Sequence, residues 1–227
     1  LTELETELQS LQDGGESIDA LQEQLDKLAL TYSTSAQQLT AIRQQAAQTM
    51  AAEINQQLQK LSMEGAELLV QLRPLAEGEF RAGGLEEVEF VIATNPGQPH
   101  KPLAKIASGG ELSRVSLAIQ VVAAGHSKIP TLVFDEVDVG IGGSTADIVG
   151  LLLKQLGDRG QVISVTHQPQ VAAHAHHHYR ASKVIESNSA ESLMVALDRR
   201  QRVDELARML GGAQVTDQTL SHASELL

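Results

Sequence analysis

The stretch Thr131-Leu132-Val133-Phe134-Asp135-Glu136 decides the fold class of this chain. Its apolar part follows Pro130 and is short, as is typical of a buried strand in a parallel sheet. Two adjacent carboxylates at the end of such a strand are costly unless they hold a cation or take part in proton transfer. We therefore expect a core strand that carries Asp135 and Glu136 to the ligand-binding edge of a sheet. An exposed acidic pair at a strand end is the alternative.

A second apolar run, residues 162–165, leads to His167. Between the two runs we expect a helix that begins at Ser144, has Asp147 at the capping-box position and ends at Gly157. Strand, helix and strand in this order form a crossover between parallel strands, so His167 and the paired acids share one edge of the sheet. We expect His167 to contact a terminal phosphate there, and a purely structural histidine is the alternative.

Upstream of these strands, residues 106–114 read Ile-Ala-Ser-Gly-Gly-Glu-Leu-Ser-Arg. Ser108 and Glu111 have the spacing of a capping box, which marks a helix start. Gly109 and Gly110 expose backbone N–H groups at the positive end of that helix, a setting suited to a phosphate group. Both interpretations use the same geometry, so this segment alone does not choose between a helix cap and a phosphate contact.

Residues 1–62 carry a different, helical pattern. The leucines at positions 1, 4, 8 and 11 alternate spacings of three and four, as in the seam of a coiled coil. Asp13-Gly14-Gly15 is predicted to break this pattern, since each glycine costs a helix about 1 kcal/mol relative to alanine. The apolar frame of residues 18–46 then runs out of phase with the first. A coiled-coil arm is the interpretation we favour, and a solvated helical hairpin is the alternative.

The period of the apolar pattern changes from helical to two near Ser62. Residues 66–73 and residues 87–92 alternate apolar and polar side chains, which predicts two half-buried strands. From Ile106 onward the chain reads helix, strand, helix, strand, an α/β layout with a parallel sheet. We therefore expect an α-helical arm over residues 1–62, followed by an α/β lobe over residues 63–227.

Composition narrows the classes of function. The chain has 227 residues, is 42% hydrophobic and contains no apolar run near the about 20 residues that span a bilayer. It shows no secretory signal, and it opens on Leu1 in mid-pattern, which indicates an excised piece. The absence of cysteine excludes disulfides and thiolate metal sites and fits a reducing cytoplasm. A net charge of −12 with 2% aromatic residues argues against extensive DNA wrapping or base stacking by this chain.

Together these segments have the order and spacing of an ABC ATPase: signature, Walker B, D-loop and switch histidine. Residues 106–114, 134–141, 165–172 and 205–212 closely resemble the RecN family, which comprises SMC-like ATPases of bacterial DNA repair. The resemblance covers the chain from about residue 62 to its end. It implies the C-terminal lobe of an ABC/P-loop-type ATPase head with a parallel sheet, preceded by the coiled-coil arm that separates the two lobes in such proteins.

The resemblance also implies roles for the site residues, beginning with those that face a second head. Ser108, Gly109, Gly110 and Glu111 would form the signature, which contacts the γ-phosphate of an ATP held by the opposing head. Asp138 would lie at the contact between the two heads. The resemblance thus implies an ATP that is shared between the two heads of a homodimer.

The remaining implied roles concern the ATP held by the same head. Asp135 would help to hold Mg²⁺, and Glu136 would orient or deprotonate the attacking water. His167 would sense the γ-phosphate. The implied cycle drives the binding and tethering of DNA ends in double-strand-break repair, by a cytoplasmic, nucleoid-associated protein with no membrane partner.

One element of the family pattern is missing from the sequence. No G-x-x-x-x-G-K-[ST] occurs, so the loop that cradles the β- and γ-phosphates is absent. We expect an N-terminal lobe upstream of the arm to supply it, and we expect this chain alone to be inactive. A nucleotide-binding subunit of an ABC transporter is the alternative function. A scaffold with vestigial motifs is disfavoured by the presence of Glu136 and His167 together.

Two further clusters stand out near the C-terminus. Four histidines lie within residues 174–178, but the sequence shows no carboxylate or helical spacing that would organise them around a metal. A polar loop is therefore the favoured interpretation. Arg199, Arg200 and Arg202 precede a predicted helix over residues 203–210. We interpret them as a solvated helix start, with contact to DNA or to an acidic partner as the alternative.

Overall fold

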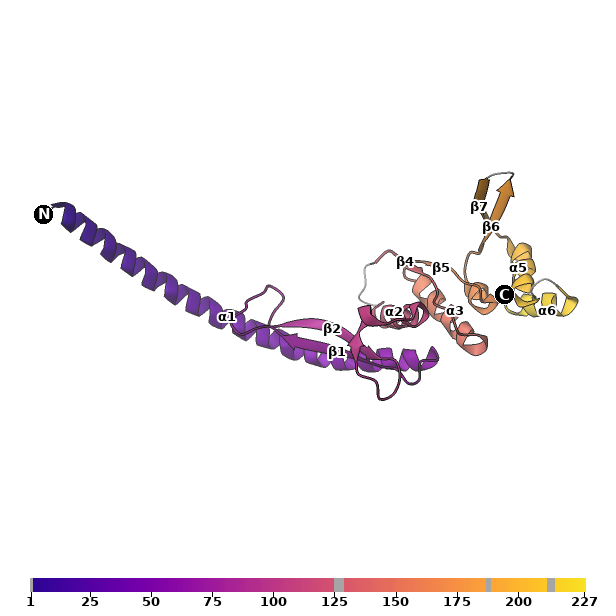
Figure 1. Ribbon diagram of the computed structural model, residues 1–227, viewed down its shortest axis with the longest axis horizontal. Helices are drawn as coiled ribbons and strands as arrows, with labels where there is room; N and C mark the ends of the chain where they lie inside the picture. Colours follow the sequence, from indigo (N-terminus) through magenta and orange to yellow (C-terminus); the bar gives the residue numbers. More distant parts are fainter. Residues whose placement is uncertain (1, 125–128, 187–188, 212–214) are drawn as a thin grey trace. The chain divides into compact units, whose positions relative to one another are not determined.

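The computed structural model describes residues 2–124, 129–186, 189–211 and 215–227 (Figure 1). In chain order its elements are α1 (Thr2–Lys60), β1 (Glu67–Pro74), β2 (Glu86–Ala93), β3 (Lys101–Pro102), the 3-10 helix η1 (Leu103–Lys105), α2 (Gly109–Ala123), β4 (Thr131–Phe134), α3 (Gly143–Gly157), β5 (Gln161–Ser164), α4 (Pro169–His174), β6 (Tyr179–Glu186), β7 (Ser189–Ala196), α5 (Arg199–Gly211) and α6 (Asp217–Glu225).

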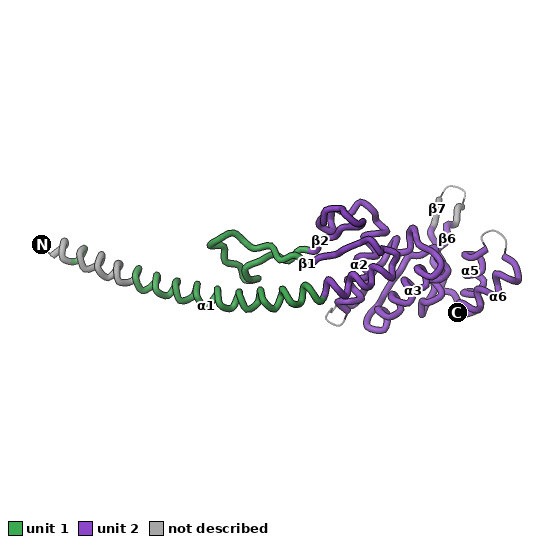
Figure 2. Tube along the Cα trace, turned by 90° about the horizontal axis from the view of Figure 1, so that it is seen from below, with its two compact units in different colours: residues 1–49, 70–89 green, residues 50–69, 90–227 purple. Residues whose placement is uncertain are grey.

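The chain forms two compact units, coloured separately in Figure 2. Unit 1 contains residues 1–49 and 70–89, and unit 2 contains residues 50–69 and 90–227. The described strands pair in the orders β1-β2-β3, β4-β5 and β6-β7. Within the residues described, no helix is both long and apolar enough to cross a membrane. The division into an arm over 1–62 and a lobe over 63–227 remains a prediction.

Helix α1 corrects one expectation from the sequence. It runs without interruption from Thr2 to Lys60, so the predicted break at Asp13-Gly14-Gly15 and the alternative of a helical hairpin are both wrong. Glycine lowers helix propensity by only about 1 kcal/mol, a local cost that a long helix can absorb from the turns on either side. Apolar side chains of the second frame, such as Leu21 and Leu28, are exposed along α1.

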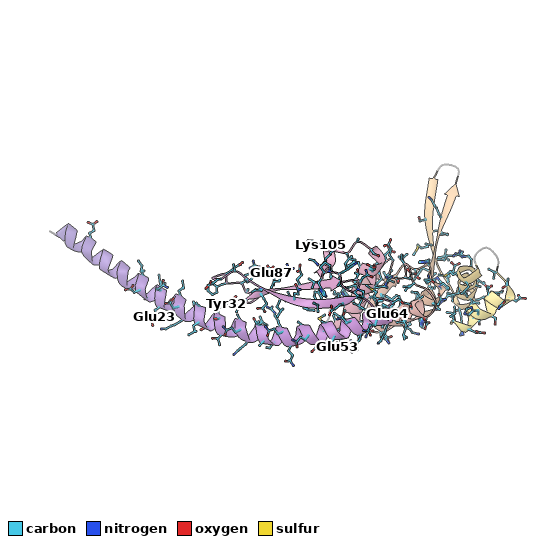
Figure 3. The ribbon with its side chains drawn as sticks, turned by 60° about the horizontal axis from the view of Figure 1, so that its bottom comes forward. Glu23, Tyr32, Glu53, Glu64, Glu87 and Lys105 are labelled. Carbon is cyan, nitrogen blue, oxygen red and sulfur yellow. The ribbon has the colours of Figure 1, made fainter. Side chains whose placement is uncertain are left out.

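In unit 1 the polar side chains of α1 hold the connection between β1 and β2. The Tyr32 hydroxyl lies 3.0 Å from the carbonyl oxygens of Arg81 and Gly84, and its ring packs edge-to-face on Phe80 at 5.0 Å (Tyr32 is labelled in Figure 3). These long-range contacts fix the loop against the helix. Gly84 has a φ of +100° with Leu39 packed close to its Cα, so a side chain there would be strained.

Glu86 is the buried polar anchor of unit 1. Its carboxylate accepts a hydrogen bond from the Thr40 hydroxyl at 2.6 Å and from Nη1 of Arg43 at 2.9 Å. The same Nη1 also donates to the carbonyl of Gly83 at 2.7 Å. The Thr40 bond, followed by Arg43, holds the pKa of Glu86 below its ordinary value of 4.5, although burial opposes the shift.

We predict that Glu86→Ala weakens unit 1 by about 2 kcal/mol, because it leaves the Arg43 guanidinium and the Thr40 hydroxyl without their acceptor. The measurement is faster amide exchange over residues 80–86. Glu87→Ala is the matched control, since that exposed carboxylate pairs with Arg81 at the surface, where ion pairs contribute little to stability. If amide exchange over residues 80–86 accelerated equally in the two variants, Glu86 would not be the buried anchor of unit 1.

The lowered pKa of Glu86 sets how the stability difference between the native chain and Glu86→Ala depends on pH. Because the folded-state pKa lies below 4.5, the Glu86 contribution is complete above that pH and is lost as pH falls through the folded value. The difference in the stability of unit 1 between the native chain and Glu86→Ala should therefore become smaller as the pH falls below 4.5.

Unit 2 begins with the last turns of α1. Leu58 and Leu61 are fully buried there, and the Asn55 amide bonds both backbone groups of Leu68, at 2.8 and 3.0 Å. Strand β2 departs from the predicted alternation, because Val88 is exposed whereas residues 91–93 are all buried. Its buried end belongs to unit 2, so the environment changes along a single strand.

Strands β4 and β5 confirm the predicted parallel pairing, with Thr131 opposite Gln161 and Phe134 opposite Ser164. They are less buried than expected. Val133 is 67% exposed and Ile163 is also exposed, whereas Phe134 is buried. The reason is that inward and outward positions alternate along both strands, so one face of this two-stranded sheet is open.

The helix that joins these strands also differs at its start. α3 begins at Gly143 with Gly142 as its N-cap and no side-chain cap, so Ser144 and Asp147 do not form the expected capping box. Asp147 instead bonds Nε2 of His174 in α4, with Oδ1 at 2.7 Å. A carboxylate therefore organises one of the four histidines, contrary to the sequence analysis.

The C-terminal part contains the antiparallel hairpin β6–β7, which the sequence analysis did not anticipate, and helices α5 and α6. α5 begins at Arg199, so the basic residues 199–202 belong to its first turn, earlier than predicted. A small core of Ala172, Leu206, Ala207 and Ala223 joins α4, α5 and α6.

Candidate functional site

The acidic pair lies where β4 ends. Phe134 and Val137 are buried on either side of it, while Asp135 and Glu136 are exposed. Oδ1 of Asp135 accepts the N–H of Glu136 at 2.9 Å. Glu136 has a φ of +58°, a left-handed conformation that costs a residue other than glycine on the order of 1 kcal/mol. Strain of this kind is concentrated at functional sites, and Glu136 shares its left-handed conformation with Ser62, whose φ is +55°.

The N-terminal turns of α2 pack against the loop that carries these acids. The Ser113 hydroxyl donates to the carbonyl oxygen of Asp135 at 2.7 Å. Nη1 of Arg114 donates to the carbonyl oxygen of Val139, also at 2.7 Å. Arg114 is buried, and this burial lowers its pKa. The 106–114 segment and the acidic loop are therefore one hydrogen-bonded structure.

The two glycines of α2 permit this close approach. A Cβ on Gly110 would lie 3.3 Å from the Cβ and the carbonyl oxygen of Val139. A Cβ on Gly109 would collide with Oε2 of Glu136. Packing against the backbone of the acidic loop therefore favours glycine at position 110, whereas at position 109 the exposed Glu136 side chain could move aside.

Ser108 caps α2 as the sequence predicts. Its Oγ accepts the N–H of Glu111 at 3.3 Å, while Ser108 itself is in an extended conformation. This bond is the first half of the capping box. It places the backbone of Gly109 and Gly110 in the first turn of a helix whose start is solvent-accessible at Gly109.

Asp138 is the most deeply buried of the predicted site residues, at 1% exposure. Its Oδ2 accepts hydrogen bonds from the Thr166 hydroxyl, from the N–H of His167 at 3.0 Å and from the N–H of Gln168 at 3.2 Å. The carboxylate therefore joins the loop after β4 to the turn after β5. A role for Asp138 in contacting a second head remains a prediction.

His167 lies at the carboxyl end of β5, next to the end of β4. The N–H of Val165 donates to the carbonyl oxygen of Phe134 at 2.9 Å, which holds the two strand ends side by side. The His167 ring is 65% exposed, with Nδ1 3.4 Å from Oδ2 of Asp138. Gln168 fixes the other side of the turn by donating from Nε2 to the carbonyl oxygen of Ile141 at 2.7 Å.

The fold therefore gathers the predicted residues at one edge of the β4–β5 sheet. Sequence reasoning missed four side chains that hold them there: Ser113, Arg114, Thr166 and Gln168. Each acts through a partner at least 22 residues away, so no local pattern could have found them.

The donors at this edge fit a magnesium ion that arrives with a nucleotide. Asp135 presents one exposed carboxylate, whose Oδ1 accepts a hydrogen bond from the Glu136 N–H. Mg²⁺ usually takes one or two carboxylates and completes its shell with phosphate oxygens and water. Among the described residues no group of three or more acidic or histidine side chains could hold a metal alone, the histidines of 174–178 included.

Comparison with known proteins defines the class of this chain. A solved structure similar to it is the Smc head domain with a coiled coil and joint from Pyrococcus yayanosii, with a TM-score of 0.51 and 21% identity over 73% of this chain and 29% of that one. No family model matches the chain. The fold is that of the C-terminal lobe of an SMC-type ATPase head, with its parallel sheet and preceding long helix.

The sequence relatives of this chain are RecN proteins. The DNA repair protein RecN of Haemophilus influenzae is 48% identical over 224 residues, which cover 99% of this chain and 40% of the relative. RecN of Xylella fastidiosa strain 9a5c is 44% identical over 221 residues, and RecN of Bacillus subtilis is 32% identical over 239. The chain aligns with the C-terminal 40% of RecN proteins, which confirms the resemblance noted in its sequence.

Proposed function

We propose that this chain is the C-terminal head lobe and arm segment of a RecN-type ATPase that acts in DNA double-strand-break repair and recombination. The observation that carries the proposal is the strained, exposed Glu136 beside Asp135, packed on the glycine start of α2, in a chain 48% identical to a RecN protein. The whole protein would hydrolyse ATP, bind or tether DNA ends and act in the cytoplasm at the nucleoid.

The first half of the proposed mechanism takes place across two heads. Ser108, Gly109, Gly110 and Glu111 bind the γ-phosphate of an ATP held by a second copy. The accessible start of α2 supports this role, because helix N-terminal N–H groups and the helix dipole favour phosphate. Asp138 would lie at the contact between the two heads, and its carboxylate joins the loop that carries Val139 to the turn after β5.

The second half takes place within one head. Asp135 binds Mg²⁺, which would neutralise charge on the phosphates when bound. Glu136 orients the attacking water and accepts its proton, and its exposed position with a fixed backbone supports that role. His167 contacts the γ-phosphate from the neighbouring strand end, and its largely exposed ring is free to do so.

The phosphate-binding loop must come from an N-terminal lobe. Two features support a missing partner: the open apolar face of β4–β5, with Val133, Ile163 and Val165 exposed, and the exposed apolar seam of α1. Additional strands and a second arm helix would cover them. The chain spans about 40% of the length of its RecN relatives, which leaves room for such a lobe.

The deciding experiment combines this chain with a separately produced upstream segment that carries the phosphate-binding loop. We expect ATP-dependent dimers and DNA-stimulated hydrolysis from the mixture and neither from either part alone. Hydrolysis by this chain alone that disappears in Glu136→Gln would overturn the proposed split site. A mixture that associates but never hydrolyses ATP would overturn the proposed activity.

A further inference from the structure

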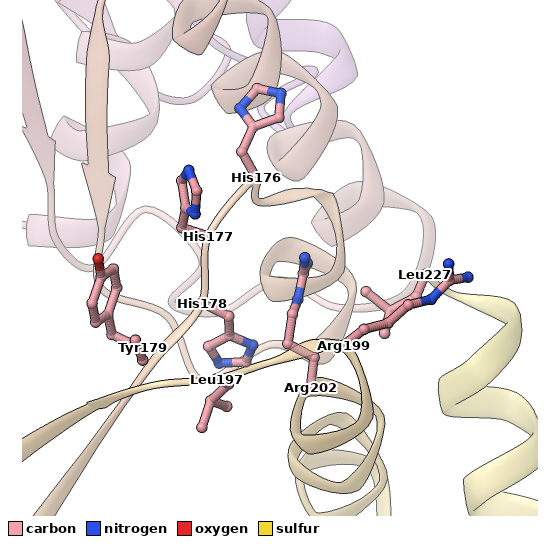
Figure 4. Close-up of a pocket in the computed structure, with 9 residues that line it drawn as sticks. His176, His177, His178, Tyr179, Leu197, Arg199, Arg202 and Leu227 are labelled. Carbon is pink, nitrogen blue, oxygen red and sulfur yellow. The ribbon is translucent and has the colours of Figure 1, made fainter.

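A second site lies in unit 2, among residues that the ATPase proposal does not use. It is a pocket of about 370 Å³ between the turn that leads into β6, the end of β7 and the start of α5 (Figure 4). Basic and histidine side chains dominate its lining, which comprises His176, His177, His178, Tyr179, Ala196, Leu197, Arg199, Arg202 and Leu227.

Two polar groups in this pocket are buried without a partner among the described residues. These are Nδ1 of His178 and Nε of Arg202. A buried polar atom without a hydrogen bond costs about 1–3 kcal/mol, so a ligand that gave either atom a hydrogen-bond partner would be favoured. Both residues belong to the lining of the pocket (Figure 4).

The Arg202 guanidinium is held in place for such a ligand. Its Nη2 donates to the carbonyl oxygens of Ala173 at 3.2 Å and Ala175 at 2.8 Å, at the end of α4. Arg199, one turn earlier on α5, is exposed and makes no ion pair among the described residues. One anchored cation and one exposed cation thus line the pocket.

The nearby acids are already neutralised by other groups. Glu205 accepts two hydrogen bonds from Arg208, at 2.6 and 3.0 Å, and its carboxylate is 3.7 Å from Nη1 of Arg180. Asp198 accepts the N–H of Gln201 at 2.8 Å as a cap of α5. The pocket lining contains Arg199 and Arg202 and, besides the terminal carboxylate of Leu227, no acidic group. Positive charge therefore exceeds negative charge there.

We propose that this pocket binds the phosphate group of a nucleotide unit. Arg199 and Arg202 supply charge-assisted hydrogen bonds, and His178 supplies a neutral one. A guanidinium fork matches phosphate oxygens in geometry and charge. The volume accommodates more than a bare phosphate, since small-molecule sites begin at about 300 Å³. The phosphate belongs either to a free nucleotide or to a nucleic-acid backbone.

This site is separate from the proposed ATPase chemistry. Its lining shares no residue with the edge formed by Asp135, Glu136 and His167. Phosphate binding in this pocket should therefore be unchanged in Glu136→Gln. If the ATPase proposal failed, the proposal of a phosphate pocket would still stand.

The test is a titration of the 227-residue chain with inorganic phosphate, followed by the NMR signals of the His178 ring and of the amides of residues 176–179. We expect saturable shifts. Arg199→Gln should weaken binding at least about fivefold, while Arg200→Gln, its exposed neighbour outside the pocket, should stay within about twofold of the native chain. His178→Gln is a second variant that leaves the anchoring bonds of Arg202 intact.

A second arm identifies the source of the phosphate. The same variants are titrated with AMP and with a short single-stranded DNA oligonucleotide at two salt concentrations. Tighter, salt-dependent binding of the oligonucleotide that Arg199→Gln weakens assigns the site to a nucleic-acid backbone. Tighter binding of AMP assigns it to a free nucleotide. The absence of shifts with all three probes, or equal losses in Arg199→Gln and Arg200→Gln, would overturn the proposal.

Discussion

Glu136→Gln should lower ATP turnover at least about 100-fold in a head assembled from this chain and its upstream lobe, because loss of a positioned general base costs about 10²–10⁴ in rate. The amide keeps the size of the side chain, so ATP-dependent dimers should still form and should persist longer than the native ones. The measurement is steady-state hydrolysis together with dimer lifetime.

Glu53→Gln provides the matched control for this variant. Glu53 is an exposed carboxylate on α1 (labelled in Figure 3). A head that carries Glu53→Gln should therefore hydrolyse ATP at the native rate. If Glu136→Gln retained more than a tenth of the native turnover, another residue would have to serve as the base. His167, whose ring is exposed at the adjoining strand end, is the candidate for that role.

Asp138→Ala should destabilise unit 2 by about 3 kcal/mol, because it leaves the Thr166 hydroxyl and the N–H groups of His167 and Gln168 without their buried acceptor. For a chain of this size that loss corresponds to a fall in Tm of about 6–12 °C. Thermal unfolding measures the total effect, and amide exchange at residues 167 and 168 locates it.

Two further variants interpret that result. Asp138→Asn keeps one acceptor oxygen and should fall between the native chain and Asp138→Ala. Asp158→Ala removes an exposed carboxylate at the end of α3 and should change stability by less than about 0.5 kcal/mol. If Asp138→Ala had the same Tm as the native chain, the predicted stabilising role of the carboxylate would be wrong. Its proposed role at the head–head contact would then be the one that remains.

Much of the fold was predictable where the pattern is local. The apolar runs ending in Asp135-Glu136 and in His167 correctly predicted two parallel strands, and the Ser108 to Glu111 spacing correctly predicted a helix start. In each case the deciding signal lies within a few neighbouring residues, which is the range over which periodicity and capping act.

Features that depend on distant partners were not predictable. The continuity of α1 through Gly14-Gly15 reflects the helix on both sides of the pair. The burial of Asp138 depends on the turn after β5, and the pairing of His174 depends on Asp147 in another helix. The pocket at Arg202 joins segments that no single window of sequence contains.

The bonds from Ser113 to Asp135 and from Arg114 to Val139 have a consequence for how two active sites would communicate. In the proposed dimer, the start of α2 and the acidic loop of one chain serve two different ATP molecules. A shift of the loop at hydrolysis would be transmitted to the opposite nucleotide through these two side chains. Coupling of this kind is reciprocal. Turnover should therefore be cooperative in ATP, with the Hill coefficient falling toward one when Arg114 is replaced by methionine.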